Sequence, residues 1–375
     1  MSALGLTACG GALPPSPAPL APPGPPPFEV VRAEAYTPPA PPPETGADPI
    51  LHSAGARLPE VRVEVEAWAA VYTADGGARF SAYLSRMGRY APLIDAALAE
   101  RGLPASLRYL PIVESGFRPG AVSRAAAAGL WQFMAPVARG FGMQVDPLVD
   151  ERRDPVRATP AALAFLEELH QRFGSWFLAL AAYNAGPSRV ERLLREHAPL
   201  AVPGDSLYLV LRPHLPRETR EFVPRFLAAA AVADAPTRYG VEGWEPMPPL
   251  AYDEVVVPDA TTLDVVAGAA GVGEEEIRAL NPHLLRGVTP RGREVRIRVP
   301  PGRGEAFAEA YARIPPAERV TVTEHVVAPG ETLSGIAQRY GIRTAELRSA
   351  NPRVQERRMQ VGTRLVVPLV PSRRE

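Results

Sequence analysis

The sequence predicts an α+β multidomain protein, in which a mainly α-helical domain is followed by two small strand–helix–helix–strand (βααβ) modules. Two observations support this prediction. Between about residues 61 and 240, apolar side chains recur at the spacing of a helix face. After residue 254 the chain repeats itself at an offset of about 70 residues, and each copy ends in a β-rich run.

Composition limits the classes of partner and cofactor. The 375 residues carry equal numbers of acidic and basic side chains. A formal net charge of zero argues against a nucleic-acid partner bound through bulk charge. The one cysteine, Cys9, rules out an intrachain disulfide, and the six histidines lack the spacing of metal ligands. We therefore expect no metal and no cofactor, and we expect a monomer.

The first 55 residues predict an anchored linker. The segment LTACG at residues 6–10 is similar to a bacterial lipobox, in which Cys9 would be lipidated; the alternative is a chance cysteine in a disordered leader. Fifteen of the 45 prolines lie within the first 50 residues, a composition that favours an extended spacer over a packed core. Only five residues precede the lipobox-like segment, too few for a signal peptide, so we expect the true start upstream.

Composition and repeats divide the rest of the chain. We expect a catalytic domain at residues 56–245, followed by a Pro-rich hinge at about 244–258. The first repeat spans 254–302 and the second 321–370, with a helical connector at 303–320. Each repeat has an apolar helix, a glycine, a second short helix and an Asn-Pro pair.

The most informative stretch is LPIVESGF at residues 110–117. We expect a helix that opens near Pro104, is kinked by Pro111 and ends at Gly116. Glu114 then falls in the last turn, where the helix dipole and apolar neighbours both disfavour a charged carboxylate. A raised pKa would suit a general acid. The alternative is a solvated glutamate near a helix end.

Two further segments carry polar groups in apolar surroundings. In GLWQFM at residues 129–134, Gln132 lies between aromatic residues, as in sugar-binding sites; a buried core segment is an equal alternative. A helix is expected to open at Thr159-Pro160, and the next one, at 176–184, is apolar on every side and therefore central. This second helix delivers Tyr183 and Asn184 to its end, beside a cleft or with purely local roles.

These motifs carry a resemblance to a known family. ES at 114–115, GLWQ at 129–132, AYNAG at 182–186 and LPRETR at 215–220 resemble, in order and spacing, motifs of the lytic transglycosylases of the goose-lysozyme-like superfamily. With the modules described below, the chain resembles in particular the membrane-bound murein transglycosylase D subgroup. The resemblance covers roughly residues 60–240 and implies a lysozyme-like catalytic domain.

The resemblance implies a reaction and its residues. Glu114 would protonate the bond between N-acetylmuramic acid and N-acetylglucosamine in peptidoglycan, then act as a base while the muramoyl C6 hydroxyl closes a 1,6-anhydro ring. No motif segment supplies an obvious second acid, unlike the carboxylate pairs of most glycosidases. Ser123 and Gln132 would contact sugar, and Tyr183 and Asn184 would line the cleft. The chain departs from the family pattern two residues after the LPRETR motif, where residue 222 is a phenylalanine and a tyrosine is usual.

The second repeat closely resembles a LysM domain, with the opening VVAPGETL at residues 326–333. LysM modules bind polymers that contain N-acetylglucosamine. The first repeat is LysM-like but degenerate, with PDAT at 258–261 in place of the Pro-Gly-Glu opening. It is either a spacer that has lost its ligand or a protein-interaction module.

These expectations lead to one main function and two alternatives. We expect a lytic transglycosylase of the cell envelope, periplasmic and held on glycan strands by LysM. If Cys9 is processed, the protein would be an outer-membrane lipoprotein. The alternatives are a muramidase of the lysozyme type that uses water and a catalytically inactive scaffold that binds peptidoglycan.

Overall fold

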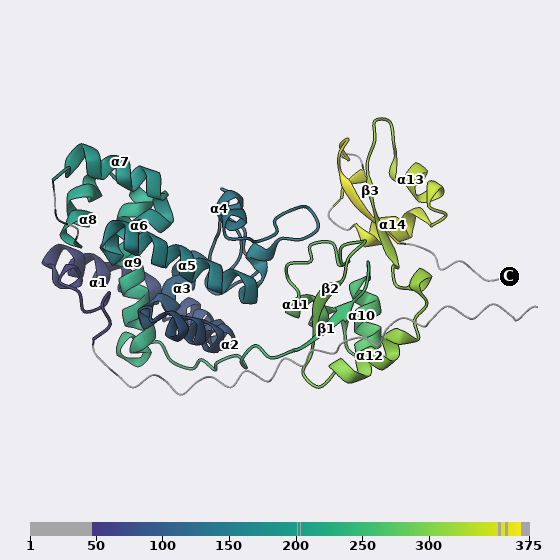
Figure 1. Ribbon diagram of the computed structural model, residues 1–375, viewed down its shortest axis with the longest axis horizontal. Helices are drawn as coiled ribbons and strands as arrows, with labels where there is room; N and C mark the ends of the chain where they lie inside the picture. The colour runs from purple at the N-terminus through teal and green to yellow at the C-terminus, as the bar shows by residue number, and fades with distance from the viewer. Residues whose placement is uncertain (1–46, 201, 203, 352–353, 357–358, 369–375) are drawn as a thin grey trace, which may run out of the picture.

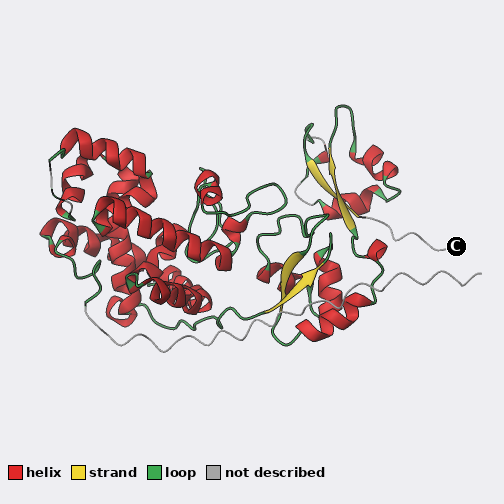
Figure 2. Ribbon diagram, viewed as in Figure 1, coloured by secondary structure: helices red, strands yellow, loops and turns green. Residues whose placement is uncertain are grey.

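The computed structural model describes residues 47–368, except residues 201, 203, 352–353 and 357–358. Cys9 and the Pro-rich segment up to residue 46 lie outside this range. Helices fill the region before residue 240, and the strands drawn in Figure 2 all lie in the two modules that follow. The expected α+β arrangement is therefore confirmed for the described part of the chain.

Among the described residues up to 240, nine α-helices form the helical domain (Figure 1). Their bounds are α1 Pro59–Thr73, α2 Ala78–Arg101, α3 Leu110–Glu114, α4 Ala135–Gly140, α5 Pro155–Phe173, α6 Trp176–Ala185, α7 Pro187–His197, α8 Ser206–Leu211 and α9 Arg217–Asp234. Helix α6 is the central one, as predicted, because its residues 176–182 are all buried. It packs against α5 and α9, and α9 also contacts α1 and α3. In the part of the chain that the structure describes, no helix has the length and apolarity to cross a membrane.

The packed body begins earlier than the expected boundary at residue 56. Ile50 is fully buried in the core of the helical domain. The Asp48 carboxylate accepts hydrogen bonds from the backbone N–H and the hydroxyl of Ser106, at 2.9 Å each. The side chains of Asp48 and Ile50 therefore attach this part of the chain to the core of the helical domain.

Two predicted helix starts are wrong. Pro111 does not kink a helix; a 3₁₀ turn at Ala105–Tyr109 comes first, and α3 starts afresh with Pro111 in its first turn, where a proline lacks no needed donor. Helix α5 begins at Pro155, one turn before Thr159, because Asp154 caps it by accepting from the backbone N–H of Val156 at 2.9 Å.

Each module is a βααβ unit with one antiparallel strand pair. The first contains β1 Asp253–Val257, α10 Leu263–Ala270, α11 Glu274–Leu280 and β2 Val295–Val299; the second contains β3 Val322–Val326, α13 Leu333–Arg339, α14 Thr344–Ala350 and β4 Arg364–Pro368. The repeated asparagine has the same task in both. Asn281 and Asn351 each donate to a helix carbonyl and exchange two hydrogen bonds with the second strand, at 2.7–2.9 Å.

The segments that join these units are attached to them. The expected hinge runs along α2, and the backbone N–H groups of Met247 and Leu250 donate to the carbonyls of Ser85 and Arg89, at 2.8 Å each. The helix expected in the connector is α12, Gly304–Ala312, which packs against α10. The hinge is therefore held in place along the helical domain.

Candidate active site

Glu114 is the last residue of α3, and its side chain is half-buried. Burial raises the pKa of the Glu114 carboxyl to about 8; the positive charge of Arg225 opposes this shift, and the negative charge of Glu218 adds to it. The acid form therefore dominates at neutral pH. Among the described residues, no side chain or backbone group donates a hydrogen bond to this carboxyl. The proton is thus available to a bound molecule.

Helix α6 brings Tyr183 and Asn184 to the same place. The Tyr183 hydroxyl donates to the carbonyl of Trp131 at 2.7 Å. Burial and the nearby charge of Glu114 raise the pKa of Tyr183 well above its usual range. The Asn184 side-chain oxygen accepts from the hydroxyl of Thr219 at 2.7 Å. This bond ties the end of α6 to α9 and leaves the Asn184 amide nitrogen without a protein partner in the described structure.

Gln132 lies in a tightly folded loop beside them. Its backbone has a φ of 50°, and its side-chain nitrogen donates to the carbonyls of Gly129 at 2.9 Å and Ala121 at 3.4 Å. The amide therefore holds the loop and leaves only its oxygen for a ligand. Gly129 is required here, because a Cβ atom at its φ of 87° would lie 1.7 Å from the carbonyl oxygen of Arg152.

The aromatic residues around Gln132 belong to the core. Trp131 is 0% exposed and Phe133 is 3% exposed. The Trp131 indole N–H donates to the hydroxyl of Thr159 at 3.1 Å. No ring face of this pair is open for stacking on a sugar, so the core alternative holds for these two aromatic residues.

Ser123 lies on the outer arm of the same loop. It is exposed, and its hydroxyl accepts from the backbone N–H of Ala127 at 3.0 Å. No described contact joins Ser123 to Glu114. Tyr183 thus lies near enough to Glu114 for the charge of Glu114 to raise its pKa, whereas Ser123 lies apart from them.

Three residues that act on this site by charge or by hydrogen bonds were not singled out by the sequence analysis. Glu218 and Arg225 both lie on α9. The negative charge of Glu218 raises the pKa of Glu114, and the positive charge of Arg225 lowers it. Phe222 lies between them on that helix and is 2% exposed. A helix places residues three and four apart on one face, so a periodic reading of LPRETR onward could have found Glu218. From the sequence alone, the motif segments offer no obvious second acid, yet Glu218, within LPRETR, has a charge that raises the pKa of Glu114.

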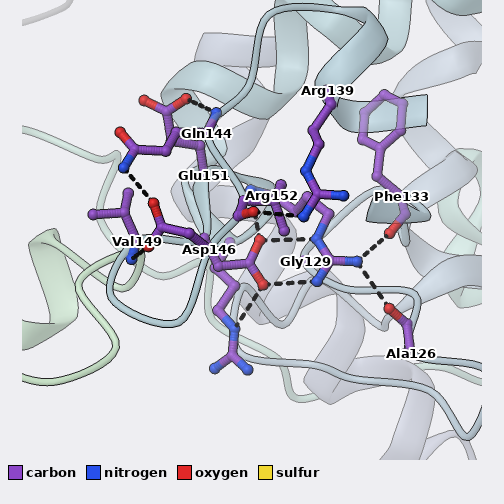
Figure 3. A network of polar contacts seen from close by, with 12 residues as sticks. Ala126, Gly129, Phe133, Arg139, Gln144, Asp146, Val149, Glu151 and Arg152 are labelled. Carbon is purple, nitrogen blue, oxygen red and sulfur yellow. Dashed lines mark hydrogen bonds and ion pairs between the residues drawn. The ribbon is translucent and has the colours of Figure 1, made fainter. Parts of the chain in front are cut away.

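The third residue, Arg152, holds the loop that contains Gln132. Its guanidinium pairs with Asp150 and donates to the carbonyls of Ala126 at 2.8 Å and Phe133 at 3.0 Å (Figure 3). Ser115 fixes the other side, because its hydroxyl donates to the carbonyl of Leu130 at 2.8 Å. Arginine at this position carries no periodic signal in the sequence. No cluster of three or more potential metal ligands exists among the residues described.

Three stretches of the chain match known protein families. Residues 92–200 match the family described as "Transglycosylase SLT domain". The chain carries a transglycosylase SLT domain. Residues 251–316 match "Lytic transglycosylase MltD, LysM-like domain", and residues 325–368 match "LysM domain". Glu114, Gln132 and the end of α6 lie inside the SLT domain, whereas Glu218 lies beyond the matched residues.

Known proteins with similar sequences extend the match across both halves. "Membrane-bound lytic murein transglycosylase D" of Escherichia coli is 30% identical over 269 residues, which are 69% of this chain and 59% of that protein. The chain thus spans about three fifths of the relative's length. A solved structure of an inactive mutant of lytic transglycosylase Slt from Pseudomonas aeruginosa is 26% identical and covers 40% of this chain and 25% of that one. The TM-score between the two structures is 0.32.

Proposed function

We propose that this chain is a lytic transglycosylase that cleaves the β-1,4 bond between N-acetylmuramic acid and N-acetylglucosamine in peptidoglycan. The observation that carries the proposal is the half-buried carboxyl of Glu114 within an SLT domain, with a pKa of about 8. Such a group is protonated at neutral pH, which is the state that a general acid needs before it meets its substrate.

Glu114 would act twice. Its carboxyl gives a proton to the glycosidic oxygen while the bond from that oxygen to the muramoyl C1 breaks. The resulting carboxylate then takes the proton of the C6 hydroxyl, and the C6 oxygen bonds to C1. A 1,6-anhydro ring forms, Glu114 regains its proton, and no water is consumed. One carboxyl is enough for this cycle, in contrast to hydrolysis by a carboxylate pair.

The neighbouring polar groups would hold the sugars. The free amide nitrogen of Asn184 and the free side-chain oxygen of Gln132 suit hydroxyl or acetamido groups near the broken bond. Tyr183 would line the cleft beside Glu114. Ser123, exposed on the outer arm of the loop, would contact a sugar further along the strand.

The second module would hold the chain on the polymer. Its opening residues 328–330 are exposed and lie at the start of a LysM match. We place the protein in the periplasm of the cell envelope as a monomer that needs no cofactor, with Cys9 as a lipid anchor in the outer membrane. In this proposal, the helical domain expected at residues 56–245 is the catalytic part, and the LysM module expected at 321–370 is the wall-binding part.

Digestion of purified sacculi tests the reaction. Mass spectrometry should find anhydromuropeptides, whereas products that end in reducing muramic acid would contradict ring closure. Glu114→Gln should lower the rate at least about a hundredfold and leave sacculus binding intact. Glu168→Gln, an exposed glutamate on α5, is the matched control and should be fully active.

One observation favours a second candidate, a muramidase that uses water. Glu218 is a second carboxylate whose charge reaches Glu114, and a hydrolase needs such a group to activate water. Glu218→Gln separates the two reactions. Hydrolysis would be abolished, whereas ring closure would continue with an altered pH profile. A wild-type chain that binds sacculi and releases no product would instead be a wall-binding scaffold.

A further inference from the structure

The first module is bound to the helical domain through a buried ion pair. The guanidinium of Arg298, on β2, donates two hydrogen bonds of 2.9 Å to the carboxylate of Asp154, which caps α5. The two side chains are 8% and 2% exposed. A pair so well shielded is screened little by salt, and removing one partner leaves an uncompensated buried charge.

The loop before Asp154 is part of the module's own core. Val149 and Leu284 form an antiparallel bridge, and Val149 is buried in the apolar cluster of the first module. The backbone N–H of Asp150 donates to the carbonyl of His283 at 2.9 Å. Figure 1 shows this loop, between α4 and α5, reaching from the helical domain toward β1 and β2.

The same loop holds the active-site segment 126–133. Asp150 pairs with Arg152, whose guanidinium binds the carbonyls of Ala126 and Phe133 at the two ends of that segment (Figure 3). Inside the segment, the carbonyl of Leu130 accepts from Ser115, which follows Glu114 in sequence, and the carbonyl of Trp131 accepts from Tyr183, whose pKa is raised by the charge of Glu114. Hydrogen bonds and short stretches of backbone therefore link the module to Ser115 and Tyr183 beside the candidate acid, and the last step, from Tyr183 to Glu114, is electrostatic.

We propose that the first module is a brace that positions the active-site segment 126–133, with Arg298 and Arg152 as positioning residues. The module thus serves the catalytic step, and neither a spacer nor a site for another protein is needed to explain it. This inference rests on the proposed function, because the segment matters only if Glu114 performs the chemistry. A small displacement of such a segment lowers the rate of reaction far more than it lowers substrate binding.

The full-length chain with Arg298→Met tests the brace. We expect kcat on sacculi to fall about tenfold, with KM and sacculus binding within about twofold of wild type. Arg298→Lys keeps the charge and should recover part of the loss. Arg296→Met, two residues earlier on the same strand at an exposed position, is the matched control and should keep wild-type kcat. Wild-type kcat in a folded Arg298→Met chain overturns the proposal.

A milder variant covers the case in which Arg298→Met does not fold. Asp154→Asn retains an oxygen that can cap α5 but removes the charge that Arg298 pairs with. We expect kcat to fall severalfold at unchanged KM. Wild-type kcat in this folded variant also overturns the proposal.

Amide hydrogen exchange separates failure of the brace from failure of the proposed function, because it needs no chemistry. Peptides that cover residues 126–133 should exchange at least about fivefold faster in Arg298→Met than in Arg296→Met. Faster exchange in a chain that makes no anhydro product would support the brace and contradict the transglycosylase. Unchanged exchange in an active enzyme would contradict the brace alone.

Discussion

The two modules have the same fold and opposite surroundings. Both pair two antiparallel strands and hold them with the same asparagine, Asn281 or Asn351. In the first module the end of the opening loop is buried: Ala260 is 9% and Thr261 is 0% exposed, and the Thr261 hydroxyl shares a hydrogen bond of 2.6 Å with the hydroxyl of Tyr311. In the second module the opening residues 328–330 are all exposed, and Glu331, the counterpart of Thr261, is half-buried.

A repeat can therefore keep its framework while its surface makes different contacts. The surface of the first module packs against the helical domain and against α12. In the second, Glu331 of the Pro-Gly-Glu opening accepts from the backbone N–H of Ala328 at 2.8 Å and from the ring of His325 at 2.6 Å. That glutamate shapes the loop and leaves the neighbouring backbone exposed. We therefore expect the first module to affect catalysis and the second to affect binding.

The largest effect that we expect is that alkaline pH abolishes lysis of sacculi but leaves sacculus binding unchanged. Burial raises the pKa of Glu114 to about 8, so the acid form is lost above that value and lysis should fall about tenfold for each further pH unit. Glu331 is the opposite case, because the hydrogen bond from Ala328 and the contact with His325 lower its pKa to about 2, and it stays ionised throughout. Sacculus binding should persist from pH 7 to 10. Lysis that rises over this range would contradict the acid role.

A matched pair of substitutions should sharpen the contrast between modules. Asn281→Ala and Asn351→Ala each remove three hydrogen bonds and should each cost about 3 kcal/mol of folding free energy in their module. Asn281→Ala should lower lysis about tenfold and keep sacculus binding. Asn351→Ala should lose sacculus binding and keep lysis of short soluble glycan strands. Identical effects of the two variants would break the comparison.

A smaller shift is expected from Glu218→Gln. Removing its negative charge lowers the pKa of Glu114, because Glu218 helps to disfavour the ionised carboxyl. The alkaline limit of lysis should move to lower pH by less than about one unit, as measured by rates between pH 6 and 10. Glu221→Gln, on the same helix and paired with Arg217, should leave the limit where it is.

The smallest effect on rate is expected from Phe222→Tyr, which restores the residue usual in the family. Phe222 is 2% exposed, so a new hydroxyl would be buried and should cost about 2 kcal/mol of stability if it finds no partner. We expect a rate within about threefold of wild type, because the phenylalanine already provides the packing. A rise of tenfold or more would show that the missing hydroxyl matters to Glu114.

Sequence patterns predicted the parts of the fold that are local. The apolar run of α6 and the repeated Asn-Pro pairs each act within a few residues of chain, so they leave a readable signal. The environment of Glu114 was also foreseen, because burial at a helix end follows from the apolar stripe of α3. The roles of Gln132 and Asn184 at the site stay predictions.

Contacts between distant segments left no such signal. Thr159 was a good candidate for a helix cap, but Asp154 takes that role and Thr159 receives the indole N–H of Trp131 instead. Arg298 meets Asp154 across 144 residues of sequence. One arginine among many in a chain of zero net charge cannot be singled out without the fold, and for that reason the docking of the first module was missed.

The cap of α5 has a consequence for how the protein is made. Asp154 is synthesised 144 residues before Arg298, an interval on the order of ten seconds at usual rates of translation. During that interval Val149 has no module core to enter, and the segment 126–133 has no brace. The helical domain therefore lacks the proposed brace until β2 has been made and the first module has folded, which makes the segment 126–133 one of the last parts of the site to be fixed in place.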